Sequence, residues 1–174
     1  MKVMSAGIVH KSDVGGVILD IRTEEQAGEA YQSILAEVSK AAPEAEIGGV
    51  FVQKMVEGGA EVILGLKRDP SFGAVIMFGL GGIFVEIFRD VSFRTAPVEK
   101  DEVTGMVQKT KAYPVLAGAR GRGEKDLECL EQCIQRLSQL SVECPQIKEL
   151  DINPLLVLDR GKGCFAADIK IMPG

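Results

Sequence analysis

The pattern of apolar positions predicts three helices. Between Thr23 and Pro43 apolar residues recur every three or four positions, and Thr23 with Gln26 has the spacing of a capping box. A second helix is predicted to start at Pro97, near its first turn, and a third to span about residues 124–142. Each segment has one apolar face, so each helix is expected to pack against another element.

Short apolar runs between these helices predict strands. They are residues 1–4, 17–21, 50–56, 60–67, 74–78, 83–88, 91–96, 147–158 and 164–171. Turn-forming residues at 68–73 and 159–163 predict two antiparallel hairpins. Because strands outnumber helices and hairpins dominate, the predicted fold class is α+β with mainly antiparallel sheets and flanking helices. A chain that begins inside a strand is expected to start part-way into a larger fold.

Composition and charge narrow the possible classes of function. The 174 residues, 46% of them hydrophobic, suit one domain or two small lobes. A net charge of -5 gives no basic surface for nucleic acid, and the sequence has no Trp for base stacking. No apolar run approaches the ~20 residues that cross a bilayer, and the N-terminus lacks the apolar core of a secretory signal. We therefore expect no nucleic-acid partner, no membrane partner and a cytoplasmic location.

The four cysteines do not have the spacing of a structural zinc site. Cys129 and Cys133 are four residues apart on a predicted helix, while Cys144 and Cys164 lie further along the chain. No C-x-x-C pair is present, and no histidine is near them in sequence. We expect reduced cytosolic thiols that act as small apolar residues.

The only histidine lies in a loop whose composition suits chemistry. His10 belongs to the segment 8–17, in which Lys11, Asp13 and the pair Gly15–Gly16 follow it. Histidine can exchange protons, attack phosphorus or bind a metal near neutral pH. A single histidine beside a glycine turn is also common as an ordinary surface residue. The residues of this loop leave both interpretations open.

Polar oxygen-bearing side chains gather on one predicted strand. Side chains alternate along a strand, so Glu149, Asp151 and Asn153 are expected to share one face. The following hairpin should bring Asp168 close to Asn153 or Pro154. Such carboxylates repel one another when ionised, and Mg²⁺ would remove that repulsion. The alternative is the charged outer face of a sheet.

Three further segments have weaker signals. The glycine-rich segment 79–82 predicts a tight loop that could bring backbone N–H groups to phosphate, or form a plain hairpin turn. The segment 118–123, with Arg120 and Arg122, suits either an anion contact or a solvent-exposed linker. Residues 52–56 could face an adenine ring or form an ordinary half-buried strand. The sequence contains no Walker A motif and no G-x-S-x-G motif.

Together and in this order, these motifs resemble the ATP-grasp domain of NDP-forming acyl-CoA synthetases. The matching segments are 8–17, 52–56, 66–73, 78–82 and 150–155. They span essentially the whole chain and are most similar to ADP-forming acetate–CoA ligase β subunits, with succinyl-CoA synthetase β subunits more distant. The resemblance implies a partial ATP-grasp fold over residues 1–174. It places part of the first lobe at about residues 1–50 and the second lobe at about 51–174.

The resemblance also implies a reaction and a partner. In this family an acyl-CoA, ADP and phosphate interconvert with a free acid, CoA and ATP. The implied ligands are ATP or ADP and Mg²⁺. The implied partner is a CoA-binding domain or subunit of the same enzyme, which makes an acyl phosphate and carries a first phosphohistidine.

Specific residues match the functional positions of the family. His10 matches the second histidine, which relays the phosphoryl group to ADP. The positions that match nucleotide contacts are Lys2 for the phosphates, Gln53, Met55 and Val56 for the adenine hinge, and Glu61, Gly81 and Gly82. The positions that match Mg²⁺ ligands are Asp151, Asn153 and Asp168.

The sequence departs from the family pattern at its start. Family members have a further stretch before the position of Lys2 and act with a CoA-binding domain, and this sequence contains neither. We expect it to be a split subunit, a fragment or a relic. An enzyme component and a non-catalytic nucleotide-binding or regulatory remnant that needs a partner chain both remain open. A phosphohistidine swivel domain of the pyruvate-phosphate-dikinase kind fits less well, because it needs no metal ligands of its own.

Overall fold

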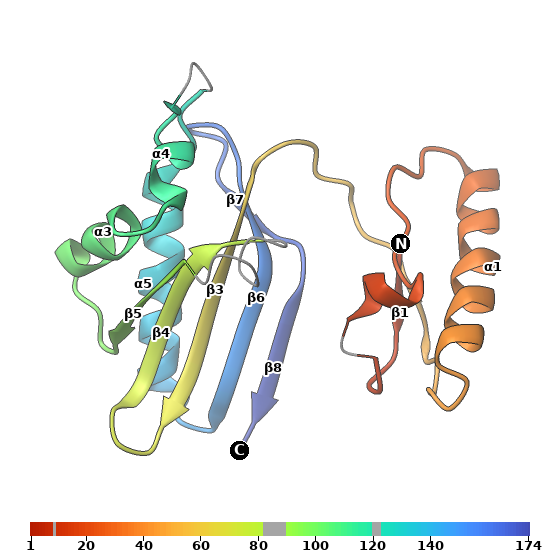
Figure 1. The fold of residues 1–174 in the computed structure, drawn as a ribbon, viewed down its shortest axis with the longest axis horizontal. Coiled ribbons are helices and arrows are strands. Elements are labelled where there is room, and N and C mark those ends of the chain that lie inside the picture. The colour runs from red at the N-terminus through yellow and green to blue at the C-terminus, as the bar shows by residue number, and fades with distance from the viewer. Residues whose placement is uncertain (9, 82–89, 120–122) are drawn as a thin grey trace. The chain divides into compact units, whose positions relative to one another are not determined.

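The computed structural model describes residues 1–8, 10–81, 90–119 and 123–174, which form two compact units. The N-terminal unit is Met1–Glu57 and the C-terminal unit is Gly58–Gly174, and each has its own apolar core (Figure 1). Across these described ranges no helix is long and apolar enough to cross a membrane. The lobes predicted at about 1–50 and 51–174 stay a prediction, because compactness alone does not define the lobes of a nucleotide-binding fold.

The N-terminal unit packs one long helix on a two-stranded sheet. Strand β1 (Lys2–Met4) pairs antiparallel with β2 (Gly49–Phe51), and α1 (Glu24–Ala41) packs against them. A short 3₁₀ helix, η1 (Lys11–Val14), lies between β1 and α1 in the chain. The buried apolar side chains of this unit are Val3, Ile8, Ile34 and Val38.

The start of α1 confirms the predicted cap. The Thr23 hydroxyl accepts a hydrogen bond from the Gln26 N–H at 3.2 Å. The Gln26 side chain accepts from the N–H of Arg22 at 2.8 Å, one residue before the donor of a standard capping box. The helix ends at Ala41, two residues before Pro43, as the proline predicts.

Two strands predicted in the N-terminal unit do not form over their full predicted ranges. The segment 17–21 makes only a single bridge, between Val17 and Lys2, and Asp20 has a left-handed φ of 57° that turns the chain away. Of the segment 50–56, only the part up to Phe51 is in a strand. Since β1 is three residues long, it offers no partner for the rest.

The C-terminal unit contains a six-stranded antiparallel sheet. Its strands are β3 (Ala60–Asp69), β4 (Gly73–Leu80), β5 (Val91–Thr95), β6 (Ile147–Val157), β7 (Cys164–Ala166) and β8 (Ile169–Pro173). The order is β5-β4-β3-β6-β7, and β8 also pairs with β6. This confirms the predicted α+β class with antiparallel sheets, including both hairpins.

Three helices cover one face of this sheet (Figure 1). They are α3 (Lys100–Gln108), α4 (Ala112–Leu116) and α5 (Leu127–Glu143). Alternate residues of the strands point into the core beneath them, which is why the apolar positions have a period of two. The strand residues in this core include Val62, Leu64, Leu66, Ile76, Phe78 and Leu150.

The helix starts differ from those predicted, because side-chain caps decide them. Helix α3 starts at Lys100 and not at Pro97, since the Glu99 N–H donates to the Glu102 carboxylate at 3.0 Å. Helix α5 starts at Leu127 and not near 124, with Asp126 as its cap. The short helix α4 was not predicted at all.

The glycine-rich segment 79–82 is not a tight loop over its described residues. Gly79 belongs to β4, opposite Ile63 of β3. A Cβ at Gly79 would lie 2.8 Å from a methyl carbon of Val91. Glycine is therefore required here by close strand packing and not by a turn. Gly82 and the predicted strand 83–88 lie outside the described residues.

The predicted strand 164–171 is interrupted at Ala167 and Asp168. Pro154 of β6 has no N–H to donate, and two residues, Asn153 and Pro154, face the single residue Ile63 of β3. Strand β7 therefore pairs with the part of β6 after this bulge and β8 with the part before it. The chain between β7 and β8 passes directly beside Asn153 and Pro154.

Asp126 ties the start of α5 to the loop between β6 and β7. Its carboxylate accepts hydrogen bonds from the N–H of Gly163 at 2.8 Å and the N–H of Cys129 at 3.1 Å. These bonds, the one from Gly163 first, hold the pKa of Asp126 below its ordinary value of 3.8. The ionised carboxylate therefore stabilises the fold.

We expect Asp126→Ala to lower the free energy of unfolding by about 1 kcal/mol at neutral pH, as loss of a helix cap does. A lowered pKa stabilises the fold above pH 3.8, and that contribution is lost as the pH falls through the lowered value. The difference between the natural chain and the variant should therefore shrink in acid. Urea unfolding at pH 7 and pH 3 measures it. Asp126→Asn, which keeps an acceptor, should cost less, and an equal cost would contradict the capping role.

Candidate functional site

His10 lies on the loop between β1 and α1, directly before η1. Its side chain makes no capping hydrogen bond, and the residue is exposed. Its backbone is held, because its carbonyl accepts from the N–H of Asp13 at 3.3 Å. Gly15, with a φ of 68°, ends the 3₁₀ helix in the left-handed conformation that favours glycine. The loop thus presents a histidine on a fixed backbone to solvent.

Gly16 fastens this loop to β1. Its carbonyl accepts from the N–H of Val3 at 2.8 Å, and its own N–H donates to the Lys11 carbonyl at 2.8 Å. A Cβ at this position would lie 2.7 Å from a Val3 methyl carbon and 2.8 Å from the Lys11 oxygen. Only glycine fits without displacement of its neighbours.

Lys2 lies on β1, opposite Phe51 of β2. Its ammonium nitrogen is 5.7 Å from the centroid of the Phe51 ring, within the range of a cation–π contact. The contact holds a positive charge on the surface of the N-terminal unit.

The segment 52–57 belongs to no strand. Met55 is 40% exposed, while Gln53 and Val56 are half-buried. Its backbone N–H and C=O groups are therefore not used in a sheet ladder. Apolar side chains beside such backbone groups suit the face and edge of a flat heterocycle.

Glu61 and Gly81 are joined through their backbones. The N–H of Gly81 donates to the carbonyl of Glu61 at 2.8 Å, so this donor is already used. A Cβ at Gly81 would lie 2.8 Å from the carbonyl carbon of Glu61. The Glu61 side chain is exposed. Gly82, Arg120 and Arg122 lie outside the described residues.

The structure brings together the predicted oxygen ligands of the C-terminal unit. The N–H of Asn153 donates to the carbonyl of Asp168 at 3.1 Å, and the N–H of Ala167 donates to that of Pro154 at 3.0 Å. This confirms the predicted closeness of Asp168 to Asn153 and Pro154. Asp151 lies two residues before Asn153 on β6, where Lys170 of β8 is its direct partner.

The electrostatics of this patch favour a bound cation. Burial raises the pKa of Asp151, and the negative charges of Glu149 and Asp168 raise it further, while Lys170 lowers it. The ionised Asp151 is therefore held at a cost in free energy when no cation is present. Two carboxylates and an amide are the hard oxygen donors that Mg²⁺ prefers, so the donor set fits that ion.

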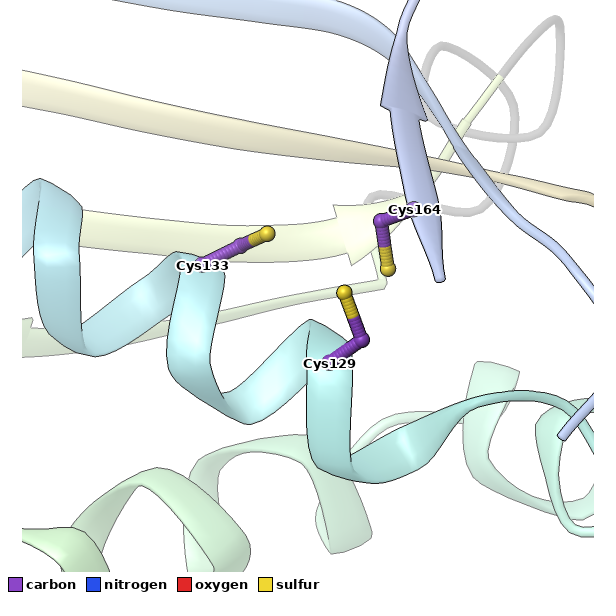
Figure 2. A group of neighbouring side chains, drawn as sticks. All are labelled: Cys129, Cys133 and Cys164. Carbon is purple, nitrogen blue, oxygen red and sulfur yellow. The ribbon is translucent and has the colours of Figure 1, made fainter. Parts of the chain in front are cut away.

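A second cluster, of sulfur atoms, was not predicted. Within residues 1–8, 10–81, 90–119 and 123–174, one group of three or more His, Cys, Asp or Glu side chains has ligand atoms within 4.8 Å of one another. It consists of Cys129, Cys133 and Cys164, all three free thiols (Figure 2). Hydrogen bonds from Cys164 and then Cys129 lower the pKa of Cys133 to about 6. The same bond to Cys133 raises the pKa of Cys164.

Only part of this cluster had a signal in the sequence. Cys129 and Cys133 are four residues apart, the spacing that places two side chains on one helix face. Cys164 is contributed by β7, and nothing in its local sequence relates it to α5. Sequence spacing of the zinc-finger kind does not detect a site built from a helix and a distant strand.

Comparison with known proteins gives concordant matches. Residues 1–172 match the family described as the ATP-grasp domain. The β subunit of acetate–CoA ligase (ADP-forming) I from Pyrococcus furiosus is 47% identical over 172 residues, covering 99% of this chain and 73% of that subunit.

Solved structures are similar over the same length. Dinucleotide-forming acetyl-coenzyme A synthetase 1 from Ca. Korarchaeum cryptofilum, in complex with coenzyme A, Ca-AMPCP and HgCl⁺, has a TM-score of 0.94 at 43% identity, covering 99% of this chain and 75% of that chain. A second structure of that enzyme holds coenzyme A and Mg-AMPPCP, with its phosphohistidine segment pointing towards the nucleotide binding site. Its TM-score is 0.85 at 39% identity, covering 100% of this chain and 75% of that chain.

We expect Gly16→Ala to lower the free energy of unfolding of the N-terminal unit by more than about 1 kcal/mol, because the added methyl group overlaps Val3 and Lys11. Gly28→Ala is the matched control. Gly28 lies within α1 with no atom within 4 Å of an added Cβ, so its replacement should stabilise by roughly 0.5–1 kcal/mol. Hydrogen exchange of amides in residues 1–57 measures both. Equal effects of the two variants would show that the loop tolerates a side chain.

We expect Asp151→Asn to weaken Mg²⁺ binding roughly tenfold or more, measured by calorimetry, since a carboxylate ligand is lost. In the absence of metal the variant should unfold at the same temperature as the natural chain or higher, because repulsion from Glu149 and Asp168 is relieved. Glu149→Gln is the control outside the predicted ligand set. If it weakens Mg²⁺ binding as much as Asp151→Asn does, the assigned ligands are wrong.

Proposed function

Because the chain belongs to the ATP-grasp domain family, we propose that it is the nucleotide-binding, phosphoryl-transferring component of an ADP-forming acyl-CoA synthetase. The observation that carries this proposal is the alignment of nearly the whole chain with the β subunit of such a ligase. The family match and the similar structures confirm the resemblance inferred from the motifs and the ATP-grasp fold.

The proposed reaction converts an acyl-CoA, ADP and phosphate into a free acid, CoA and ATP, and is reversible. A CoA-binding partner forms the acyl phosphate and a first phosphohistidine. The chain then accepts the phosphoryl group and delivers it to ADP. The Pyrococcus relative is named as a β subunit, which supports a partner subunit for this chain as well.

His10 is the proposed phosphoryl relay. An imidazole nitrogen of His10 attacks the phosphorus of the partner's phosphohistidine, and the phosphorus–nitrogen bond of that residue breaks. A terminal oxygen of ADP then attacks the same phosphorus, and the bond to His10 breaks. The relay splits one long transfer into two displacements. The exposed side chain and held backbone of His10 support this role, since transfer requires a reachable but positioned nucleophile.

Each unit contains residues with a proposed nucleotide contact. Lys2 supplies positive charge for the phosphates, and Gln53, Met55 and Val56 face the adenine. Glu61 contributes an exposed carboxylate from the start of β3. The N–H of Gly81 is already bonded to Glu61, so Gly81 contributes by letting the backbones approach closely. Gly82, which lies outside the described residues, is proposed as a further nucleotide contact.

Asp151, Asn153 and Asp168 are proposed to hold Mg²⁺. When bound, Mg²⁺ neutralises phosphate charge, which is the main electrostatic requirement of phosphoryl transfer. The raised pKa of Asp151 and the backbone bond between Asn153 and Asp168 support this assignment.

We expect His10→Ala to reduce ATP formation by roughly a thousandfold or more, because the nucleophile is lost. The chain is mixed with the CoA-binding subunit of an ADP-forming acetate–CoA ligase, acetyl-CoA, ADP, phosphate and Mg²⁺, and ATP is measured by luminescence. The natural chain should also acquire an acid-labile phosphate on residue 10.

Ser12→Ala is the matched control, because Ser12 is the hydroxyl nearest in sequence that could take a phosphoryl group instead. It should leave ATP formation and the acid-labile phosphate unchanged. If His10→Ala forms ATP as fast as the natural chain, the relay role is wrong. If the natural chain binds Mg-ATP in calorimetry but transfers no phosphoryl group, the chain is a non-catalytic nucleotide-binding component.

A further inference from the structure

Three of the four cysteines converge at the junction of α5 and β7. Cys129 and Cys133 project from successive turns of α5, and Cys164 is the first residue of β7. Figure 2 shows the three sulfur atoms pointing toward one another across the gap between the helix and the strand. All three residues are half-buried free cysteines.

The spacing of the sulfur atoms matches a three-coordinate metal site. The three Sγ atoms lie within 4.8 Å of one another. The centre of a triangle with sides of 4.8 Å is about 2.8 Å from each corner, and a metal–thiolate bond is roughly 2.3 Å long. Small side-chain rotations would therefore bring all three sulfurs to bonding distance without movement of the backbone.

The backbone around the cluster is already fixed. The Asp126 carboxylate accepts a hydrogen bond from the N–H of Cys129, which carries one of the three sulfur atoms. It also accepts one from the N–H of Gly163, the residue directly before Cys164. The N–H of Asp126 donates to the Leu158 carbonyl at 2.9 Å, which ties the same helix start to the end of β6. The geometry does not depend on a ligand for its formation, which lowers the free-energy cost of binding.

A solvent-exposed hollow reaches Cys129 of the cluster. A hollow of ≈ 500 Å³ opens at the start of α5 and is lined by Asp126, Cys129, Gly163 and Arg160, among others. An ion can enter by this route and reach Cys129 first. A usable metal site needs such an entry path.

We propose that Cys129, Cys133 and Cys164 form a binding site for one thiophilic d¹⁰ metal ion, Cu⁺ or Zn²⁺. Three sulfur ligands satisfy the soft-donor preference of both ions. Cu⁺ takes the three sulfurs alone, while Zn²⁺ completes its tetrahedron with water from the hollow. On binding, three metal–thiolate bonds form, and each cysteine that is still protonated releases its S–H proton to solvent, with no change of oxidation state. The bound ion would join α5 to β7 in the C-terminal unit.

The experiment titrates the reduced, metal-free chain with Cu⁺ and separately with Zn²⁺, each against a chromophoric chelator. We expect one equivalent of at least one ion to bind and to protect three of the four thiols from a thiol reagent. Each of Cys129→Ser, Cys133→Ser and Cys164→Ser should weaken binding roughly a hundredfold or more. X-ray absorption should count three sulfur neighbours at the metal.

Cys144→Ser is the matched control, because Cys144 follows the other end of α5 and lies outside the cluster. It should bind the ion as the natural chain does. Circular dichroism and the unfolding midpoint of each metal-free variant separate a lost ligand from a lost fold, and Cys133→Ala provides a second, apolar replacement. The proposal is overturned if neither ion binds at one equivalent, or if folded cluster variants bind as tightly as Cys144→Ser.

Discussion

The C-terminal unit depends on the change of partner along β6. This strand pairs with β3 on one side, and on the other with β8 before Asn153 and with β7 after Pro154. Proline has no N–H for the ladder, and two residues of β6 bulge opposite Ile63, so one continuous partner strand cannot form. The interruption places Asp168 beside Asn153, and the hairpin that precedes it places Cys164 beside α5.

Two chemically different clusters follow from this one hairpin. The proposed ligands Asp151, Asn153 and Asp168 lie at or near the bulge, and their oxygen atoms are donors that suit hard cations. The sulfur atoms gather where β7 starts, four residues before Asp168 in the chain, and soft ions are preferred there. The N-terminal unit contributes a third element, a histidine loop fixed by the contact of Gly16 with Val3. Phosphoryl transfer as proposed uses the first and third of these elements and leaves the sulfur cluster unused.

Sequence patterns predicted elements well wherever local forces decide them. The amphipathic spacing and Thr23 cap located α1, and the turn at 68–73 located the β3–β4 hairpin. Errors arose where tertiary partners decide. In the segment 50–56 the strand ends at Phe51, because its partner β1 is short. Gly79 and Gly81 allow close packing of the backbone instead of forming a loop. Helix α5 starts at Leu127, three residues after the predicted start near residue 124, because Asp126 caps it.

The sequence by itself determined the α+β class, the ATP-grasp family and the neighbourhood of Asn153, Pro154 and Asp168. These depend on periodicity, motif order and a short hairpin, all of which are local or linear properties. Only the tertiary structure decided that Cys164 meets Cys129 and Cys133, and that the N–H of Gly81 is bonded to Glu61. Such contacts join distant segments, and their distances depend on strand register and helix packing, which no spacing along the chain records.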